Sequence, residues 1–341
     1  MLQLKRAKIN PIMVPDPSNW WESKAVFNCS VLNDGKNIHM LYRAIGEYED
    51  YVSRIGYASS NDGLSFIRRK EPSMYPEMEY ESYGIEDPRL TIIDDENYVT
   101  YVVLSNYVRN NPSVSTALAR TNDFFNYEKL GIITVEGSQD KDVVLFPKSN
   151  GDSELGKYMI LHRPSSWIGP EYNTDRPSIW IAEGDSVTNF VKHSLLIKPE
   201  QSWEALKVGT GVPPIKTKKG WLVIYHGVSS EHVYSAGAFL LDIKEPNKIL
   251  GRTKSPLLAP KEDYELKGDV NNVVFPSGAC VLDNKLFVYY GAADKVCCLA
   301  TVDLQEIIDY LLSDVCAIEL YKEWPEVDNS LPRSRSNFIT H

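Results

Sequence analysis

The sequence has few cysteines and histidines, and they lack the spacings of metal ligands. An odd number of five cysteines, with no C-x-x-C pair, is neither a disulfide framework nor a zinc site. The six histidines show no H-E-x-x-H spacing. We therefore predict no metal and no cofactor, and we expect the cysteines to be reduced and packed mostly in strands.

The chain also lacks long apolar runs and clusters of basic residues. Residues 1–6 contain no apolar signal-peptide core, and no uninterrupted apolar run approaches the ~18 residues of a membrane helix. A formal net charge of −10 without a basic block disfavours nucleic acid and anionic membranes as partners. These absences predict a cytoplasmic globular protein with an acidic surface.

What the chain does contain is a succession of short strand-like segments. Runs rich in Val, Ile, Tyr and Phe are separated by turn sequences such as Asn-Asp-Gly at 61–63 and Lys-Lys-Gly at 218–220. One helix is predicted at about 304–312, where apolar residues recur at helical spacing. With 341 residues and 43% hydrophobic content, the chain can form two average domains or one large all-β domain.

A repeat indicates the single domain. Five segments begin an apolar strand after a loop, and a second strand that ends in a polar residue follows each of them; the segments are 25–28, 84–87, 141–144, 207–210 and 270–273. Their spacing of roughly 55–65 residues fits a four-stranded propeller blade. We predict one all-β domain over 1–341, a five-bladed β-propeller with a short C-terminal helix and tail at 304–341. The predicted blades are 25–80, 84–135, 141–200, 205–262 and 269–303.

Equivalent positions of different blades point toward the propeller axis, so polar residues at such positions converge. Singly, each has a plain structural explanation, since a strand-end arginine is usually solvated and a histidine beside Tyr225 is usually a core residue. Together they predict a polar pocket that combines acids with several cations. Its predicted members are Asn28, Arg43, Asp87, Lys141, Arg163, Lys207, His226 and Asp294.

The motif Gly-Ile-Glu-Asp-Pro-Arg at 84–89 places charge at the start of an apolar strand. Asp87 and Arg89 could form an ion pair at a strand start. Alternatively, Asp87 carries chemistry while Glu86 and Arg89 form the structural pair and Pro88 fixes the backbone. One acid beside several cations suits attack by an anion such as phosphate better than hydrolysis by two carboxylates.

The motif at 84–89 resembles the hallmark of glycoside hydrolase family 130, the β-mannoside phosphorylases and related β-mannosidases. The resemblance spans roughly 8–312, and the family fold is a five-bladed β-propeller. Further matching segments are 27–28, 145–147, 162–164, 207–209, 220–222, 225–228, 233–237, 240–242, 268–270 and 289–291.

The resemblance implies a role for each site residue. Asp87 matches the general acid, which protonates the glycosidic oxygen through the 3-hydroxyl of the mannosyl unit. The residues that match the mannosyl site are Asn28, Arg43, Lys207 and Asp294, and those that match the phosphate site are Lys141, Arg163, His226 and Tyr234. Lys141 departs from the arginine of related phosphorylases, which keeps the charge but not the bidentate geometry. Cys29 stands where a small Ser or Pro is expected.

The implied function is an inverting β-mannoside phosphorylase with inorganic phosphate as co-substrate, which gives α-mannose 1-phosphate and a shortened acceptor. The motif favours β-1,2 over β-1,4 linkages. The alternatives are a β-mannosidase, whose base would be Glu231 or Asp142, and a non-catalytic carbohydrate-binding propeller. Aromatic residues in loops 47–51, 106–113 and 167–176 fit either sugar stacking or capping of the blades. The C-terminal helix and the tail from 324 are candidate contacts of a homo-oligomer.

Overall fold

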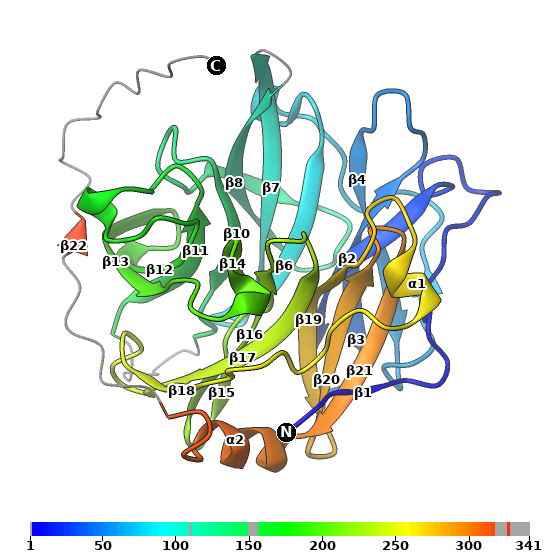
Figure 1. The fold of residues 1–341 in the computed structure, drawn as a ribbon. Helices are drawn as coiled ribbons and strands as arrows, with labels where there is room; N and C mark the ends of the chain where they lie inside the picture. Colours follow the sequence, from blue (N-terminus) through cyan, green and yellow to red (C-terminus); the bar gives the residue numbers. More distant parts are fainter. Residues whose placement is uncertain (1, 109–110, 149–155, 318–325, 328–341) are drawn as a thin grey trace.

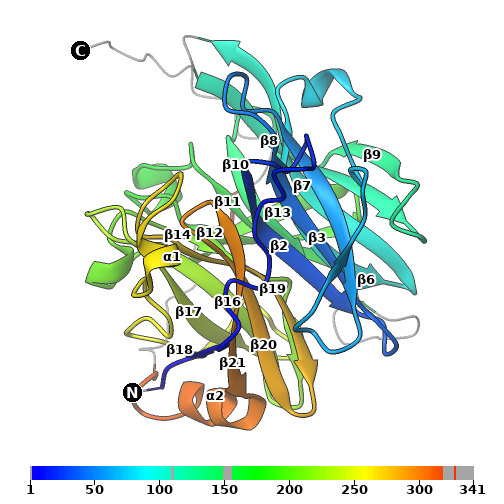
Figure 2. The ribbon, with the colours of Figure 1, turned by 90° about the vertical axis from the view of Figure 1, so that its right-hand side faces the viewer.

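The strand-like runs of the sequence form five antiparallel sheets around a common axis (Figures 1 and 2). The structure, a computed structural model, describes residues 2–108, 111–148, 156–317 and 326–327, with only the backbone at 106–108, 111–112 and 326–327. The inner strand of each sheet lies near the axis, and three further strands follow outward. The predicted five-bladed β-propeller is confirmed.

The first three blades follow the chain in order. Blade 1 consists of β2 (Ala25–Asn33), β3 (Ile38–Ile45), β4 (Ser53–Ser60) and β5 (Ile67–Arg68). Blade 2 consists of β6 (Ile85–Ile93), β7 (Glu96–Val108), β8 (Asn111–Thr121) and β9 (Glu128–Ile132). Blade 3 consists of β10 (Asp140–Leu145), β11 (Tyr158–Pro164), β12 (Ile179–Ser186) and β13 (Asn189–Ile197), and β22 (Glu326–Val327) pairs with its outer edge.

The last two blades bring in the N-terminus. Blade 4 consists of β14 (Lys207–Thr210), β16 (Gly220–Val228), β17 (Tyr234–Leu241) and β18 (Ile249–Arg252), and β15 (Ile215–Thr217) also pairs with β16. Blade 5 consists of β19 (Val274–Leu282), β20 (Lys285–Ala292), β21 (Val296–Asp303) and β1 (Lys5–Arg6). The pairing of β1 with β21 closes the ring with the other end of the chain, a contact that the sequence repeat did not predict.

Helical segments are short. They are α1 (Asp263–Leu266), α2 (Leu304–Leu311) and the 3-10 turns η1 (Glu79–Glu81), η2 (Pro170–Tyr172) and η3 (Ser202–Glu204). The side chain of Asp303 caps α2 by accepting the backbone N–H of Glu306 at 2.9 Å. The buried face of α2, formed by Ile307, Ile308 and Leu311, packs against the core that blades 4 and 5 share. The predicted C-terminal helix is confirmed.

The structure corrects the alignment of the repeat. The inner-strand residue that faces the second strand at the site is Phe27, Glu86, Lys141, Gly209 or Phe275 in blades 1 to 5. This residue is the third one in the predicted segments 25–28, 84–87 and 207–210, so these three segments are aligned correctly with one another. The matching segments of blades 3 and 5 are 139–142 and 273–276, in place of the predicted 141–144 and 270–273. The prediction that the fifth strand begins at 270 is wrong, because β19 begins at Val274 after Asn272 adopts a left-handed backbone, with φ 59°.

The five cysteines are unbonded to one another and buried. Four lie in strands, whereas Cys316 follows α2. No helix within the described part of the chain is long and apolar enough to cross a membrane. The tail residues 318–325 and 328–341 lie outside the described residues, so the predicted contact of the tail with a second subunit is not addressed.

A buried acid clamps the strands of every blade. In four blades, a glutamate before the inner strand accepts a hydrogen bond from a tyrosine on the second strand, at 2.7 to 3.0 Å. A cation on the outermost strand pairs with the same carboxylate. The four sets are Glu22, Tyr42 and Arg68; Glu81, Tyr101 and Lys129; Glu204, Tyr225 and Arg252; and Glu265, Tyr290 and Arg6.

Blade 3 builds its clamp from different residues. Asp140 takes the place of the glutamate, His162 that of the tyrosine and His193 that of the outer cation. All five acids are at most 1% exposed, so each needs its partners to offset the cost of burying a charge. The clamp thus ties the start of each inner strand, or the loop before it, to the second and outermost strands.

The clamp of blade 4 predicts a specific loss of stability. We expect Glu204→Ala to lower the free energy of unfolding by ~3–5 kcal/mol, because Tyr225 and the buried Arg252 lose the carboxylate to which they donate. Denaturant titration measures this loss. Glu245→Ala is the control: it breaks an ion pair with Lys248 in which both side chains are more than half exposed, and should leave stability nearly unchanged. Equal effects of the two substitutions would contradict the clamp.

Candidate active site

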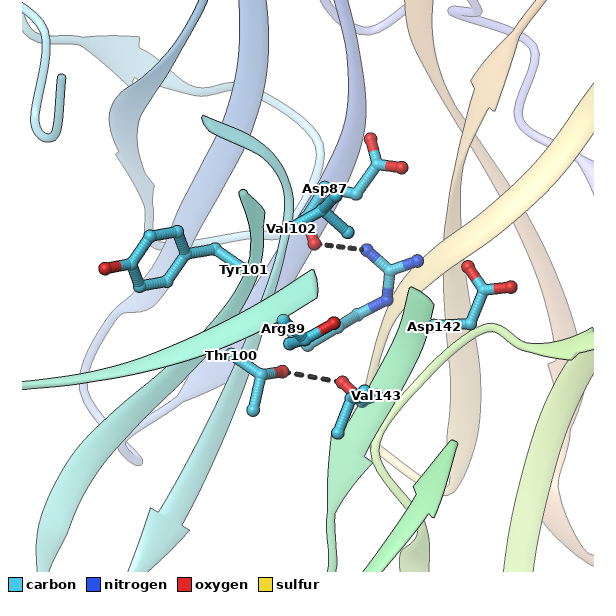
Figure 3. A pocket seen from close by; sticks show the side chains of 8 residues that line it. Asp87, Arg89, Thr100, Tyr101, Val102, Asp142 and Val143 are labelled. Atoms are coloured by element: carbon cyan, nitrogen blue, oxygen red, sulfur yellow. Dashed lines mark hydrogen bonds between the residues drawn. The ribbon is translucent and has the colours of Figure 1, made fainter. Parts of the chain in front are cut away.

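Bulges in three inner strands bring polar side chains to the axis. In β2, β6 and β10 the pairing register shifts at Asn28, Asp87 and Asp142, whose φ angles are 48°, 49° and 58°. Asparagine and aspartate are the side chains that tolerate this left-handed backbone best after glycine. Asn28 Nδ2 donates to Asp87 Oδ1 at 2.8 Å. Asp87 and Asp142 both line a narrow hollow together with Arg89 and Thr100 (Figure 3).

Arg89 holds the backbone of this hollow together. Its guanidinium lies between the two carboxylates in Figure 3, with Nη1 donating to the backbone oxygen of Asp87 at 3.0 Å. Nε donates to the backbone oxygen of Gly211 in blade 4 at 2.6 Å. The two structural readings of the motif are therefore wrong. Arg89 pairs with neither the Asp87 carboxylate nor Glu86, because its side chain points across the axis toward blade 4.

Glu86 instead binds the cations on either side of it. Arg43 Nη2 donates to Glu86 Oε1 at 2.5 Å, and Lys141 Nζ lies 3.4 Å from Oε2. Arg43 also lies 3.6 Å from Asp87 Oδ1 and above the ring of Phe27. Burial lowers the pKa of Arg43, but the carboxylates of Glu86 and Asp87 outweigh it and hold that pKa above its usual range. Arg43 is thus a fixed cation beside Asp87.

Asp294 lies on the same side of the site, in the turn between β20 and β21. Its φ of 50° is again left-handed. Burial raises the pKa of Asp294 to about 6, and the nearby charges of Asp87 and Glu86 add to this rise while Arg43 opposes it. This carboxyl group therefore titrates close to neutral pH.

A second group of basic side chains surrounds Asp142. Arg163 Nε donates to Asp142 Oδ2 at 2.6 Å, and His226 Nε2 lies 3.7 Å from the same oxygen. Burial would raise the pKa of Asp142, but the positive charges of Arg163 and Arg89 hold it well below its usual range. Gly209 permits this approach, because a Cβ there would stand 2.2 Å from Asp142 Oδ2.

Lys207 and Tyr234 complete this group. Lys207 Nζ lies 5.2 Å from the ring centroid of Tyr234, which also stacks on His226 at 6.0 Å. Burial lowers the pKa of Lys207 to about 8, and the charge of Arg163 contributes. Burial likewise lowers the pKa of His226 to about 3, so its imidazole is neutral at pH 7.

All nine predicted site residues thus lie in two adjoining groups. The first contains Asn28, Arg43, Asp87 and Asp294, and the second contains Lys141, Arg163, Lys207, His226 and Tyr234. Glu86 joins the groups, since it binds both Arg43 and Lys141. Among the described residues, no cluster of three or more His, Cys, Asp or Glu side chains is placed to hold a metal ion.

Asp142 was not among the predicted members of the pocket and was named only as a possible base of the alternative β-mannosidase. The corrected register brings it into the site, because Asn28, Asp87 and Asp142 are the bulge residues of successive blades. An alignment of 139–142 with 84–87 would have placed Asp142 opposite Asp87 in the sequence. It would also have placed Lys141 opposite Glu86, whose charge Lys141 meets in the structure.

One of the predicted loop aromatics lies beside the first group, since the Arg43 guanidinium is 5.9 Å from the ring centroid of Tyr51. Tyr48 and Tyr51 stack with ring centroids 6.1 Å apart, and the Tyr48 hydroxyl donates to Asp269 at 2.9 Å. Trp167 stacks on Tyr172 with centroids 5.7 Å apart. Of the loop 106–113, almost all side chains lie outside the described residues.

Comparisons with known proteins identify the family of the chain. A family model described as β-1,4-mannooligosaccharide phosphorylase matches residues 5–313. The 1,2-β-oligomannan phosphorylase of Thermoanaerobacter sp. is 39% identical over 313 residues, which are 90% of this chain and 99% of that protein. The β-1,2-mannobiose phosphorylase of Listeria innocua is 39% identical over 267 residues, which are 77% of this chain and 70% of that protein.

A solved structure has the same fold. The β-1,2-mannobiose phosphorylase of Listeria innocua in complex with β-1,2-mannobiose superimposes with a TM-score of 0.79 and 30% identity, covering 91% of this chain and 99% of that one. The resemblance seen in the motif at 84–89 therefore extends along nearly the whole chain. The family model and the relatives together show that this chain belongs to glycoside hydrolase family 130.

Proposed function

We propose that this protein is an inverting β-1,2-mannoside phosphorylase. It cleaves the terminal mannosyl unit from a β-1,2-linked manno-oligosaccharide with inorganic phosphate and releases α-mannose 1-phosphate and a shortened acceptor. Phosphate is a co-substrate, and the reaction uses no other cofactor. We further propose a cytoplasmic location, because free buried cysteines are typical of reducing compartments.

One observation carries the proposal: several cations are crowded into the second group with a single carboxylate among them. Burial and Arg163 disfavour the charge on Lys207, and Lys141 also contributes to lowering its pKa to about 8. A phosphate anion at this place would relieve that repulsion and offer acceptors to Arg163 and Lys141, while Lys207, which the resemblance matches to the mannosyl site, lies beside them.

The first group supplies the acid. In the proposed reaction, Asp87 gives its proton to the 3-hydroxyl of the mannosyl unit while that hydroxyl passes its own proton to the glycosidic oxygen. The bond between C1 and the glycosidic oxygen breaks, and a phosphate oxygen forms a new bond to C1 from the opposite face. Asn28 and Arg43 hold the Asp87 carboxylate, and Asp294 accepts hydrogen bonds from sugar hydroxyls.

Hydrolysis fits this geometry less well. A base would have to activate water, and Asp142 is a poor base because Arg163 and Arg89 hold its pKa low. Glu231 is exposed and accepts from Ser230 at 2.8 Å. For the linkage, the relatives at 36–39% identity are named for β-1,2 mannosides, whereas the β-1,4-mannooligosaccharide phosphorylase of Ruminococcus albus is 32% identical.

The decisive experiment is incubation of β-1,2-mannobiose with and without phosphate, followed by product analysis. We expect mannose 1-phosphate and mannose with phosphate, and no turnover without it. Release of free mannose at the same rate in both incubations would contradict phosphorolysis. A parallel incubation with β-1,4-mannobiose tests the linkage, and faster turnover of that substrate would reverse the assignment.

The acid role predicts the effect of one substitution. Asp87→Asn should lower turnover by ~10²–10⁴-fold, because general acid catalysis contributes that much, while the melting temperature changes little. Glu231→Gln, at an exposed carboxylate, is the control and should keep full activity. If Asp87→Asn retains more than a tenth of the wild-type rate, Asp87 is not the acid.

Asp294 predicts a pH dependence of sugar binding. Since its pKa is raised to about 6, the carboxyl group gains a proton as the pH falls below 6 and loses its capacity as a charged acceptor. The dissociation constant for mannobiose should therefore rise as the pH falls from 7 to 5. Calorimetry without phosphate measures this free of phosphate titration. Asp294→Asn should bind more weakly at pH 7 with no such rise, and a persistent rise would assign the titration elsewhere.

A further inference from the structure

In blades 1, 3 and 4 the clamp residue stands one position before a site residue. On the second strands of these three blades, the residue that hydrogen-bonds the buried acid is followed directly by a polar residue of the site. The pairs are Tyr42 and Arg43, His162 and Arg163, and Tyr225 and His226. Because successive strand residues point to opposite faces, the clamp anchors one face of the strand while its neighbour faces the site.

In blade 3 this connection is tighter than in the other blades. Asp140 Oδ2 accepts from His162 Nδ1 at 2.7 Å, and Asp140 Oδ1 accepts the backbone N–H of Arg163 at 3.0 Å. One carboxylate therefore holds both the clamp residue and the backbone of the site arginine. The guanidinium of Arg163 is then held from the other side by Asp142.

His193 orients the clamp histidine. Its Nδ1 lies 3.0 Å from His162 Nε2, and Trp167 packs edge-on against both rings, with centroids 5.6 and 5.2 Å away. Asp140, His162 and His193 are each at most 2% exposed. Burial lowers the pKa of His193 to about 3, which keeps it neutral. The ring of His162 thus has a fixed orientation, with one nitrogen on Asp140 and the other on His193.

We propose that Asp140 and His162 are positioning residues for Arg163, and through it for the phosphate anion, whereas Glu22 and Tyr42 position Arg43 and through it the mannoside. This inference rests on the proposed function, because it takes Arg163 as a phosphate ligand, and on the match of Arg43 to the mannosyl site. It assigns the clamp of blade 3 to phosphate and the clamp of blade 1 to the mannoside.

Two matched substitutions test the division. His162→Phe removes the hydrogen bond to Asp140, and Tyr42→Phe removes the equivalent bond to Glu22. We expect His162→Phe to raise KM for phosphate about tenfold and KM for mannobiose less than twofold. Tyr42→Phe should do the reverse.

A rescue and a second variant separate positioning from stability. His162→Asn places an amide N–H near the position of Nδ1 and should restore most of the phosphate affinity. Asp140→Asn is nearly isosteric and should also raise KM for phosphate. It serves as the test if His162→Phe does not fold. The rise in melting temperature on adding inorganic phosphate alone gives a readout without turnover: it should shrink in His162→Phe and Asp140→Asn and persist in Tyr42→Phe.

Equal changes of both KM values in the two Phe variants, or a lower melting temperature with an unchanged phosphate KM, would overturn the inference. A His162→Asn variant that behaves like His162→Phe would also overturn it. Failure of the proposed function is visible in the wild type alone, as turnover that does not depend on phosphate. The two failures are therefore distinguishable before any variant is made.

Discussion

The buried carboxylate of each blade is the constraint on which the rest of the structure depends. A charge with at most 1% exposure is tolerated only when donors surround it. Each acid therefore fixes a second-strand aromatic residue and, in four blades, a cation of the outermost strand. In blade 5 that cation is Arg6, whose guanidinium contacts both oxygens of Glu265 at 2.8 Å. The N-terminal strand is thus held in the ring by the same interaction that shapes the blades.

Three site residues stand one position after the clamp residues on the second strands of their blades. Arg43, Arg163 and His226 come directly after clamp residues, and Asn28, Asp87 and Asp142 occupy the bulges of the facing inner strands. The left-handed backbone of these three residues is a local cost that the surrounding sheets enforce. Small polar side chains meet that requirement and carry the chemistry at the same positions. Gly291 has a related role in blade 5, because a Cβ there would lie 2.1 Å from Asn28 Oδ1.

Charge is distributed unevenly across the site, and this asymmetry gives the two groups their different chemistry. Around Asp87 the carboxylates of Glu86 and Asp294 offset Arg43, and the pKa of Asp294 is raised as a consequence of burial and those neighbours. Around Asp142 the balance is reversed: burial lowers the pKa of Lys207, and the charges of Arg163 and Lys141 add to this fall. One side is suited to holding a proton and sugar hydroxyls, and the other is suited to an anion. Glu86 lies at the boundary and contacts a cation of each group.

The sequence by itself determined the existence of the repeat, the five-bladed ring, the C-terminal helix and eight of the nine candidate site residues. These depend on strand periodicity, on spacing and on motifs, all of which are local. The ninth residue, Tyr234, came only from the family resemblance. Only the tertiary structure decided which charges meet. Arg89 binds a carbonyl 122 residues away, and Glu86 pairs with Arg43 and Lys141. Asp142 was recognised as a site residue only when the strand pairing moved the third repeat segment by two positions, from 141–144 to 139–142.

The clamps had a sequence signal that could be interpreted only with the fold. In blades 1, 2, 4 and 5 an aromatic residue precedes the acid, and the tyrosine that donates to the acid follows 20 to 25 residues later. Partners so distant in sequence come together only when the ring closes and neighbouring strands pack side by side. A buried charge then pairs with the donor or acceptor that lies nearest to it in space.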